Sequence, residues 1–229
     1  MSYLNDSYIK EFKAKIISIN SNKIILNQTF FYSKSGGQPS DIGELISEKK
    51  RIKVIDTIKD NQNNIIHISE NETDFEIGEE ITGYIDWNIR YQYMKMHTSL
   101  HILCSIIPFS VTGGQIGYEK SRLDFNLENS SIDKNIIQEK INNILKDDHK
   151  VEYEWITNED LDKKPELVRT MSVKPPRISG KIRLVKIGNI DLQPCGGTHV
   201  RSTKEIGKII IKKIENKGKK NRRINIILD

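Results

Sequence analysis

Short apolar runs alternate with polar turn residues through the first part of the chain. KAKIISI and NKIILNQTFFY flank the polar break NSN, and KRIKVIDTIK and NNIIHISE flank DNQNN. EEITGYID follows a further turn signal, EIG. Runs of this length between turns are typical of β-strands, and a succession of them favours a small barrel. We therefore expect a β-rich, barrel-like domain over residues 1–86.

The spacing of the apolar residues changes after residue 86. From Trp87 onward, Met94, Leu100 and Ile107 recur at helical intervals, and Pro108 stops the run. This pattern predicts a helix from about residue 87 to residue 107. The next stretch, VTGGQIGYEKSRLDFNL, is typical of a loop that leads into a strand over residues 122–127.

A second helix and several strands follow. The apolar stripe that predicts the helix consists of Ile132, Ile136, Ile137, Ile141, Ile144 and Leu145. Ser130 and Asp133 resemble a capping box at its start, and a further amphipathic piece covers residues 158–168. KIRLVKI, GKIIIKKI and RINIILD are typical of strands. This mixture indicates the α+β class, with a second domain over residues 87–229.

Composition narrows the class of protein. The 229 residues are 36% hydrophobic and 29% charged, which is typical of a folded globular chain. The N-terminus has no basic start followed by an apolar run, and no apolar stretch approaches the length of a membrane span. Cys104 and Cys195 are too few for a disulfide framework. We therefore expect a cytoplasmic protein, with Cys104 buried as a small apolar residue.

The positive charge is concentrated near the C-terminus. The formal net charge is +5, and KKIENKGKKNRRINIILD holds seven lysines and arginines interrupted by Glu215. A patch of this kind attracts an anionic partner, although a solvated hairpin tip would explain it equally well.

Two pairs of residues could bind a metal. In HTSLH, His97 and His101 are four residues apart, so a helix would place both rings on one face. In PCGGTHV, Cys195 and His199 flank two glycines, which allow a tight turn. Together they form a nitrogen-and-sulfur set suited to zinc, although HTSLH lacks the glutamate of the H-E-x-x-H protease motif. Taken alone, they leave open a structural zinc clip, a catalytic zinc site and histidines with packing roles.

Three motifs, HTSLH, PCGGTHV and FYSKSGGQPSDIG, together resemble the editing module of alanyl-tRNA synthetase and its free-standing, AlaX-type relatives. GYEKSRLDFNL and KGKKNRRINI are also similar to that family, so the resemblance covers nearly the whole chain. It implies a small N-terminal β-barrel-like domain followed by an α/β-sandwich editing domain. It also implies hydrolysis of the ester that joins a wrong amino acid, serine or glycine, to tRNA(Ala).

The same resemblance assigns a metal and a partner. It implies one Zn²⁺ per chain, with the ligands His97, His101, Cys195 and His199. We see no synthetase catalytic domain, so we expect editing in trans, without ATP, by a monomer that binds no membrane. The basic residues expected to contact tRNA phosphates are Lys217, Lys219, Lys220, Arg222 and Arg223. Lys120 and Arg122 are candidates for contacts with the acceptor stem.

Rejection of correct Ala-tRNA(Ala) requires a pocket that recognises the serine hydroxyl. The polar side chains expected to line it are Ser35, Gln38 and Thr98. Gly36 and Gly37 are expected to bring the backbone close to the substrate. Ser35 and Gln38 could instead satisfy a tight turn, and Thr98 could cap or pack. Asp41 could brace the loop, but a solvated acid is the more common role for such a residue.

Two other functions stay open from the sequence. A zinc-stabilised tRNA-binding module would keep the metal ligands and the basic turn without hydrolysis, although the intact SGGQ loop argues against it. An editing domain for another tRNA, such as that for threonine, shares the histidine pair and the Cys-x-x-x-His motif. The Cys-Gly-Gly-Thr-His form and the SGGQ loop favour the alanine branch.

Overall fold

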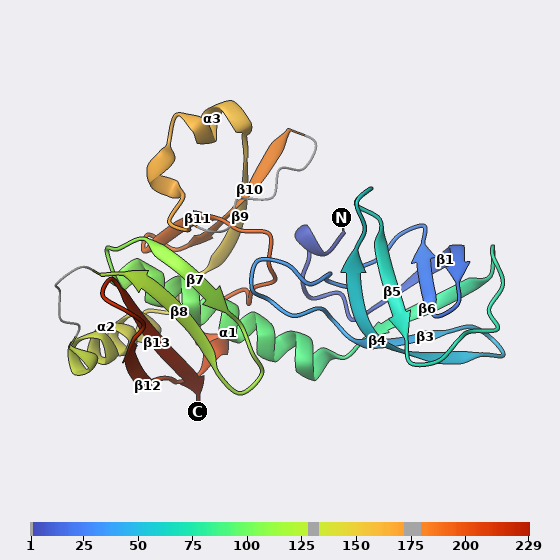
Figure 1. The fold of residues 1–229 in the computed structure, drawn as a ribbon, viewed down its shortest axis with the longest axis horizontal. Coiled ribbons are helices and arrows are strands. Elements are labelled where there is room, and N and C mark those ends of the chain that lie inside the picture. Colours follow the sequence, from blue (N-terminus) through green and yellow to red (C-terminus); the bar gives the residue numbers. More distant parts are fainter. Residues whose placement is uncertain (1, 128–132, 172–179) are drawn as a thin grey trace. The chain divides into compact units, whose positions relative to one another are not determined.

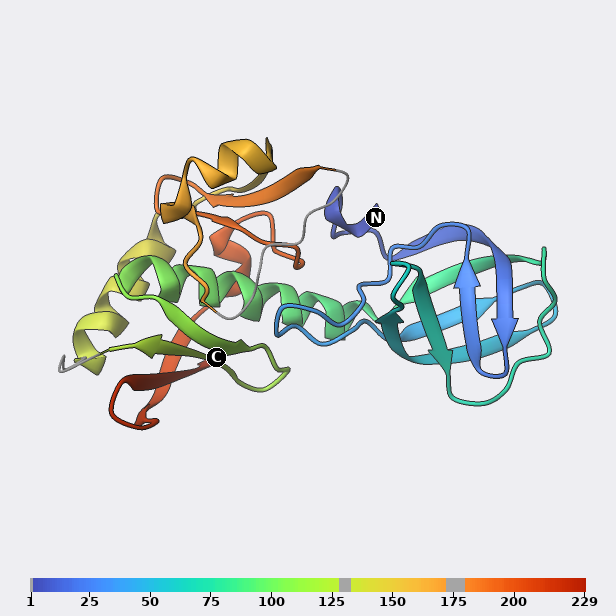
Figure 2. The same cartoon turned by 45° about the horizontal axis from the view of Figure 1, so that its top comes forward.

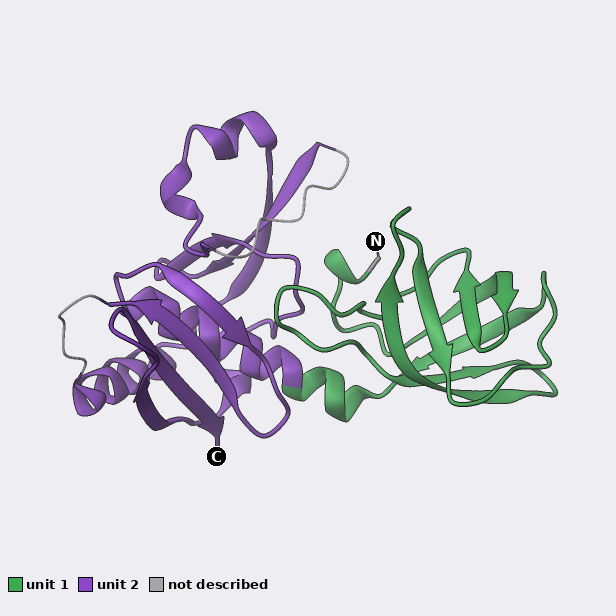
Figure 3. Ribbon diagram, in the orientation of Figure 1, with its two compact units in different colours: residues 1–92 green, residues 93–229 purple. Residues whose placement is uncertain are grey.

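The computed structural model describes residues 2–127, 133–171 and 180–229. The chain divides into two compact units, Met1–Gln92 (unit 1) and Tyr93–Asp229 (unit 2), which are coloured separately in Figure 3. The division falls within helix α1 (Trp87–Ile106), so the first residues of this helix belong to unit 1 and the rest to unit 2.

Unit 1 is a closed antiparallel barrel with the strand order β1-β2-β5-β4-β3-β6 (Figure 1). Its elements before α1 are η1 (Ser2–Leu4), β1 (Glu11–Asn20), β2 (Lys23–Leu26), β3 (Gly43–Ile46), β4 (Arg51–Lys59), β5 (Ile65–Ser69) and β6 (Glu80–Ile85). Strand β1 closes the barrel because it pairs with both β2 and β6. Closure leaves no open sheet edge.

Alternating burial along β1 builds the core of the barrel. Phe12, Ala14 and Ile16 are buried and the residues between them are exposed, as expected for a strand with one face inward. Leu45 and Val54 from β3 and β4 complete the same apolar cluster. The prediction of a small N-terminal β-barrel is confirmed, although β3 was not among the predicted strands.

Unit 2 combines two antiparallel sheets with helices. Its elements after α1 are β7 (Val111–Gln115), β8 (Ser121–Asn126), α2 (Lys134–Lys146), β9 (Val151–Thr157), α3 (Asn158–Asp162), η2 (Pro165–Leu167), β10 (Lys181–Ile187), β11 (Asp191–Pro194), η3 (Thr203–Ile206), β12 (Ile209–Asn216) and β13 (Asn221–Leu228). The sheet orders are β11-β10-β9 and β12-β13-β8-β7. Figures 1 and 2 show α1 running between the two sheets. The α+β class is therefore confirmed.

Two predicted segments differ from the structure. The amphipathic piece over residues 158–168 is a short helix, α3, followed by the 3₁₀ turn η2. Pro165 explains the break, because a proline disfavours helical geometry in the residue before it. The predicted loop at Val111–Gln115 is strand β7, which pairs with β8. Its two glycines, Gly113 and Gly114, are poor strand formers, so pairing with β8 rather than local propensity forms this strand.

The start of α2 is set by Asp133. Its side chain accepts hydrogen bonds from the backbone N–H groups of Asn135 and Ile136, which satisfies two of the free donors at the helix start. Ser130 and Ile132, which were predicted to belong to this region, lie outside the described residues. Among the residues that are described, no helix combines the length and the apolar character that a membrane crossing requires.

Candidate metal centre

Four side chains from two segments of unit 2 converge on one point. His97 and His101 lie one turn apart on α1, and Cys195 and His199 lie in the turn that follows β11. Their ligand atoms all lie within 4.8 Å of one another. Cys195 Sγ is 3.5 Å from His97 Nε2 and 3.4 Å from His199 Nε2. The three histidines are buried and the cysteine is half-buried, so the cluster is largely shielded from solvent.

A chain of buried polar groups holds His101. Its Nδ1 lies 2.8 Å from Asp191 Oδ2, which leaves Nε2 for the cluster. The other carboxylate oxygen of Asp191 accepts a hydrogen bond of 2.6 Å from Gln193 Nε2. Gln193 Oε1 in turn accepts from the Cys104 thiol at 3.6 Å. A carboxylate behind a histidine ligand fixes its ring orientation and its tautomer.

Thr98 plays the matching part for His199. The Thr98 hydroxyl donates to the carbonyl of Met94 at 2.9 Å, so its oxygen is left to accept from His199 Nδ1 at 3.1 Å. This contact turns His199 Nε2 toward Cys195. Thr98 is completely buried and contacts His199 on the side away from Cys195.

Arg183 holds the turn that carries Cys195. This residue is buried in β10, donates from Nε to the carbonyl of Cys195 at 2.9 Å and also donates to the carbonyl of Gly197. Its guanidinium lies over the ring of Tyr153, 4.4 Å from the ring centroid. Sequence reasoning missed Asp191, Gln193 and Arg183. The one available signal was a lone arginine inside the apolar run KIRLVKI.

Electrostatics prepare the cluster for a cation. Burial lowers the pKa of His101, but its hydrogen bonds with Asp191 and Cys195 outweigh burial and raise that pKa to about 10. Burial raises the pKa of the Cys195 thiol, but the neighbouring histidines, His97 first among them, outweigh burial and hold that pKa well below its ordinary value. Burial also lowers the pKa of His199. A thiol and an imidazole must each present an unprotonated ligand atom to bind a cation, so any metal bound here would be bound with release of protons.

The ligand types, and the two distances from Cys195, are those that a zinc ion would require. Zinc bonds of about 2.0–2.1 Å to nitrogen and 2.3 Å to sulfur place the ligand atoms roughly 3.3–3.6 Å apart. The two distances measured from Cys195 Sγ, 3.4 and 3.5 Å, agree with that spacing. Imidazole and thiolate are also the ligand types that zinc prefers.

The SGGQ segment of unit 1 is a tight turn. Ser35 and Gln38 exchange both backbone hydrogen bonds, at 3.2 and 2.9 Å, and the φ angles of Gly36 and Gly37 are 55° and 84°. Positive φ at both central residues is the signature of a type I′ turn, which glycine adopts without strain. The Ser35 hydroxyl lies 2.7 Å from the hydroxyl of Tyr32, so it satisfies the turn locally. Gln38 is buried, whereas the two glycines are exposed.

The interpretation of Asp41 as a solvated loop acid was wrong. Asp41 is buried and pairs with the guanidinium of Arg90, which is also buried. Its carboxylate also accepts from the backbone N–H of Tyr32 at 2.5 Å. Arg90 further donates to the carbonyls of Ser7 and Phe30. Asp41 therefore braces the stem of the SGGQ turn against the first residues of α1, all within unit 1.

Known proteins match the chain along nearly its whole length. An alanyl-tRNA editing protein AlaX-M from Saccharolobus solfataricus is 37% identical over 227 residues, which cover 97% of this chain and 95% of that protein. A second AlaX-M, from Methanosarcina mazei, is 37% identical and covers 97% of this chain and 93% of its own length. The chain belongs to the alanyl-tRNA editing protein family.

Two family models match separate parts of this member of the alanyl-tRNA editing protein family, and each part contains some of the candidate site residues. The family described as "tRNA synthetases class II (A)" matches residues 4–89, which include the SGGQ turn. The family described as "Threonyl and Alanyl tRNA synthetase second additional domain" matches residues 182–225, which include Cys195 and His199. An alanine–tRNA ligase from Pyrococcus abyssi is 34% identical over 93% of this chain but over 24% of the ligase, so the chain corresponds to one part of that enzyme.

The basic residues predicted to contact RNA lie together in this editing-family chain. Lys217, Lys219 and Lys220 form the turn between β12 and β13, and Arg222 and Arg223 begin β13. The predicted hairpin is therefore confirmed. The sequence did not predict that Arg223 pairs with a carboxylate, that of Asp124 on β8.

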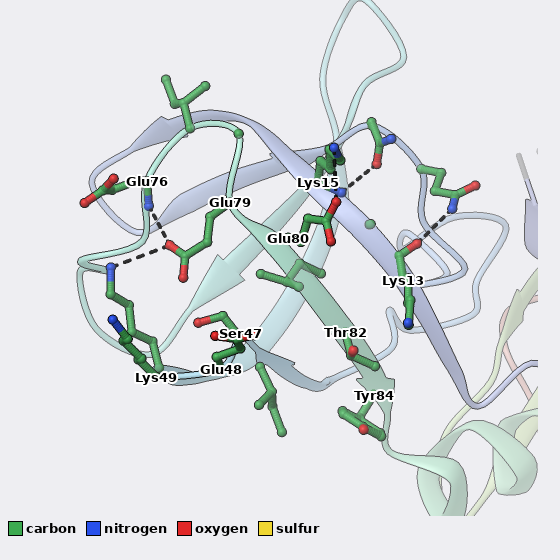
Figure 4. Close-up of a pocket in the computed structure, with 18 residues that line it drawn as sticks. Lys13, Lys15, Ser47, Glu48, Lys49, Glu76, Glu79, Glu80, Thr82 and Tyr84 are labelled. Atoms are coloured by element: carbon green, nitrogen blue, oxygen red, sulfur yellow. Dashed lines mark hydrogen bonds and ion pairs between the residues drawn. The ribbon is translucent and has the colours of Figure 1, made fainter.

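A separate hollow of about 1080 Å³ lies on unit 1 and contains none of the predicted site residues (Figure 4). Four lysines and four glutamates are among the residues that line it. Lys15 pairs with Glu80 at 3.1 Å, and Lys50 pairs with Glu79 at 3.5 Å. Because these charges offset one another, the hollow has no strong preference for an anion or a cation.

Proposed function

We propose that this chain is a trans-editing hydrolase that deacylates tRNA(Ala) carrying serine or glycine. The cluster of three histidines and Cys195 carries the proposal, in a chain of which 97% matches alanyl-tRNA editing proteins. Zn²⁺ is the ion that suits three imidazoles and one thiolate, with His97, His101, Cys195 and His199 as its ligands.

The chain's own residues prepare the site in this proposal. Bound zinc supplies Lewis-acid chemistry, by which an ester carbonyl or a water is polarised. Asp191 and Thr98 orient His101 and His199, so the rings of these two histidines are already turned toward the cluster. Arg183 fixes the backbone on which Cys195 stands. The basic turn Lys217–Lys220 and Arg222–Arg223 attract the phosphates of the tRNA.

Selectivity is proposed to come from hydrogen bonding to the serine hydroxyl. A site built around such a bond rejects a substrate that lacks the hydroxyl by roughly 10⁴. The residues proposed for this role are Ser35, Gly36, Gly37 and Gln38 of the domain over residues 1–86. In the editing domain over residues 87–229, Thr98 is proposed to act separately, by positioning His199.

Deacylation assays with purified protein test the proposal. We expect rapid hydrolysis of Ser-tRNA(Ala) or Gly-tRNA(Ala), with Ala-tRNA(Ala) spared, and no hydrolysis by Cys195→Ala. His149→Asn is the matched control, because it removes an imidazole of unit 2 that lies outside the cluster. Equal rates for wild type and Cys195→Ala, or loss of metal from the control, would contradict the proposal.

A further inference from the structure

One face of the sheet β12-β13-β8-β7 is polar. Along β8, Ser121, Leu123 and Phe125 are buried, whereas the alternate residues are partly exposed. Strand register places Arg223 opposite Asp124 and Asn225 opposite Arg122. α1 lies on the other side of this sheet (Figures 1 and 2). The side chains of Arg122, Asp124, Asn126 and their partners on β13 therefore form an outward layer, which we call the polar face.

Asp124 organises two arginines on the polar face. Its carboxylate accepts from Arg122 Nη1 at 2.5 Å and from Arg223 Nε and Nη2 at 2.8 and 2.9 Å. Burial raises the pKa of Asp124, but the hydrogen bonds from Arg223 and Arg122 outweigh it and lower that pKa, so the carboxylate stays charged. The Asp124 carboxylate thus binds both guanidinium groups, and the three side chains together carry a net charge of +1. Within the described part of the chain, Arg122 Nη2 and Arg223 Nη1 have no hydrogen-bond partner and remain available to an anion.

Gly113 leaves this cluster uncovered. It lies opposite Asp124 on β7, where an added Cβ would come within 3.4 Å of Asp124 Oδ2. A larger residue there would lie against the Asp124 carboxylate, to which both guanidinium groups are bound. Both guanidinium side chains keep about a quarter of their surface exposed, 25% for Arg122 and 24% for Arg223.

The charge of the whole chain is concentrated beside the polar face. Residues 212–223 hold seven lysines and arginines and one glutamate, a net charge of +6. The chain as a whole carries +5, so all its other residues together carry −1. Such a local excess raises the concentration of a polyanion at this surface.

The polar face does not suit a protein partner. None of the large hydrophobic residues that are exposed in the described chain lies on β7, β8, β12 or β13. Protein interfaces centre on buried aromatic and apolar anchors, which this layer lacks. Its guanidinium groups are donors that suit the phosphates of a nucleic-acid backbone, whereas the Asn225 amide already donates to Glu215.

We propose that the sugar–phosphate backbone of the tRNA lies across the polar face, with Arg122 and Arg223 binding phosphate oxygens and Asp124 acting as the positioning residue that holds them. The contact continues onto the turn lysines at the end of the same hairpin. This proposal rests on the proposed function only in taking tRNA as the RNA. It predicts a contact that is independent of base sequence.

The test measures the dissociation constant of uncharged tRNA(Ala) over a range of KCl concentrations. For Arg122→Gln/Arg223→Gln we expect about tenfold weaker binding and a slope of log K against log salt that is smaller by about 1 to 2, because each lost phosphate contact removes roughly 0.7–0.9. Lys53→Gln/Lys186→Gln is the control of equal charge change, since these lysines pair with Glu70 and Glu154 and do not belong to the polar face. Affinity and slope equal to the control would overturn the proposal.

A second variant leaves the arginine pair intact. Asn126→Asp adds a negative charge to the polar face without changing the size of the side chain, and we expect weaker binding with the wild-type fold. Deacylation assays separate the two proposals. If Arg122→Gln/Arg223→Gln binds RNA more weakly than wild type but wild type hydrolyses no ester, the polar-face proposal is supported and the proposed function fails. If wild type hydrolyses Ser-tRNA(Ala) and neither variant changes binding, the polar-face proposal fails alone.

Discussion

Unit 1 buries an arginine–aspartate pair and a histidine, and unit 2 buries three histidines around a cysteine. In unit 1 the chain supplies every partner: Arg90 binds Asp41, and His67 lies 3.1 Å from the carbonyl of Ile24 and 2.9 Å from the hydroxyl of Thr29. In unit 2, Asp191 and Thr98 hold His101 and His199 from the outer side of the cluster, and the inner nitrogens of His97 and His199 face the Cys195 sulfur. Buried polar groups whose acceptor atoms converge on one point indicate a binding site. Buried polar groups that satisfy one another's hydrogen bonds indicate a structural core.

Breaking the closed pair of unit 1 gives the largest expected effect on stability. Asp41→Asn leaves the guanidinium of Arg90 buried with carbonyl partners alone, so we expect the free energy of unfolding to fall by about 3–5 kcal/mol. Urea unfolding followed by Trp87 fluorescence in a Trp155→Phe background reports on unit 1, because each unit contains one tryptophan. The double variant Asp41→Leu/Arg90→Met should lose less than Asp41→Asn; an equal or larger loss would contradict this account.

Lowering the pH tests the same comparison, because it should destabilise unit 1 through His67. Burial lowers the pKa of His67 from 6.5 to about 4, so the unfolded chain takes up this proton first as the pH falls. The contribution of neutral His67 is complete above pH 6.5 and is lost as the pH falls from about 6.5 to 4, by about 3 kcal/mol in total. His67→Gln has no titrating group here, so the difference in unfolding free energy between wild type and variant should shrink on acidification. A difference that stays constant with pH would contradict this.

Zinc affinity of the cluster in unit 2 should fall when Asp191, which contacts His101, is changed. Asp191→Asn leaves all four ligands in place but weakens the hold on His101, and we expect zinc affinity to fall about 10–100-fold in a competition with a chromophoric chelator. Asp160→Asn, on the exposed surface of α3, is the matched control. Unchanged zinc affinity in Asp191→Asn would mean that the carboxylate is structural only.

The smallest expected effect concerns the SGGQ turn. Ser35→Ala and Tyr32→Phe each remove one partner of the same hydroxyl–hydroxyl bond, and each should cost about 1 kcal/mol or less in unfolding free energy. The double variant should cost less than the sum of the two, because both singles break the shared bond; Tyr32→Phe also removes the hydrogen bond to the Ser35 carbonyl. Strict additivity would show that the two hydroxyls are not coupled in solution.

Sequence reasoning succeeded where a residue type carries its own chemistry. Histidine and cysteine at motif spacing identified the four side chains that the structure brings together, and alternating apolar runs identified the barrel. It failed where a role depends on a partner far along the chain. Asp41 meets Arg90 across 49 residues and Asp191 meets His101 across 90, and neither carboxylate differs locally from a surface acid. Arg183 and Gly113 gain their roles only from strand pairing.

The spacing of the four ligands has a consequence for chain entropy. His97 and His101 stand near the beginning of unit 2, and Cys195 and His199 stand roughly a hundred residues later. An ion bound to all four closes that long loop, as a disulfide would, and a cross-link of this span removes about 4–5 kcal/mol of conformational freedom from the unfolded chain. If the proposed ion binds, it would therefore also tie the start of unit 2 to the turn that follows β11.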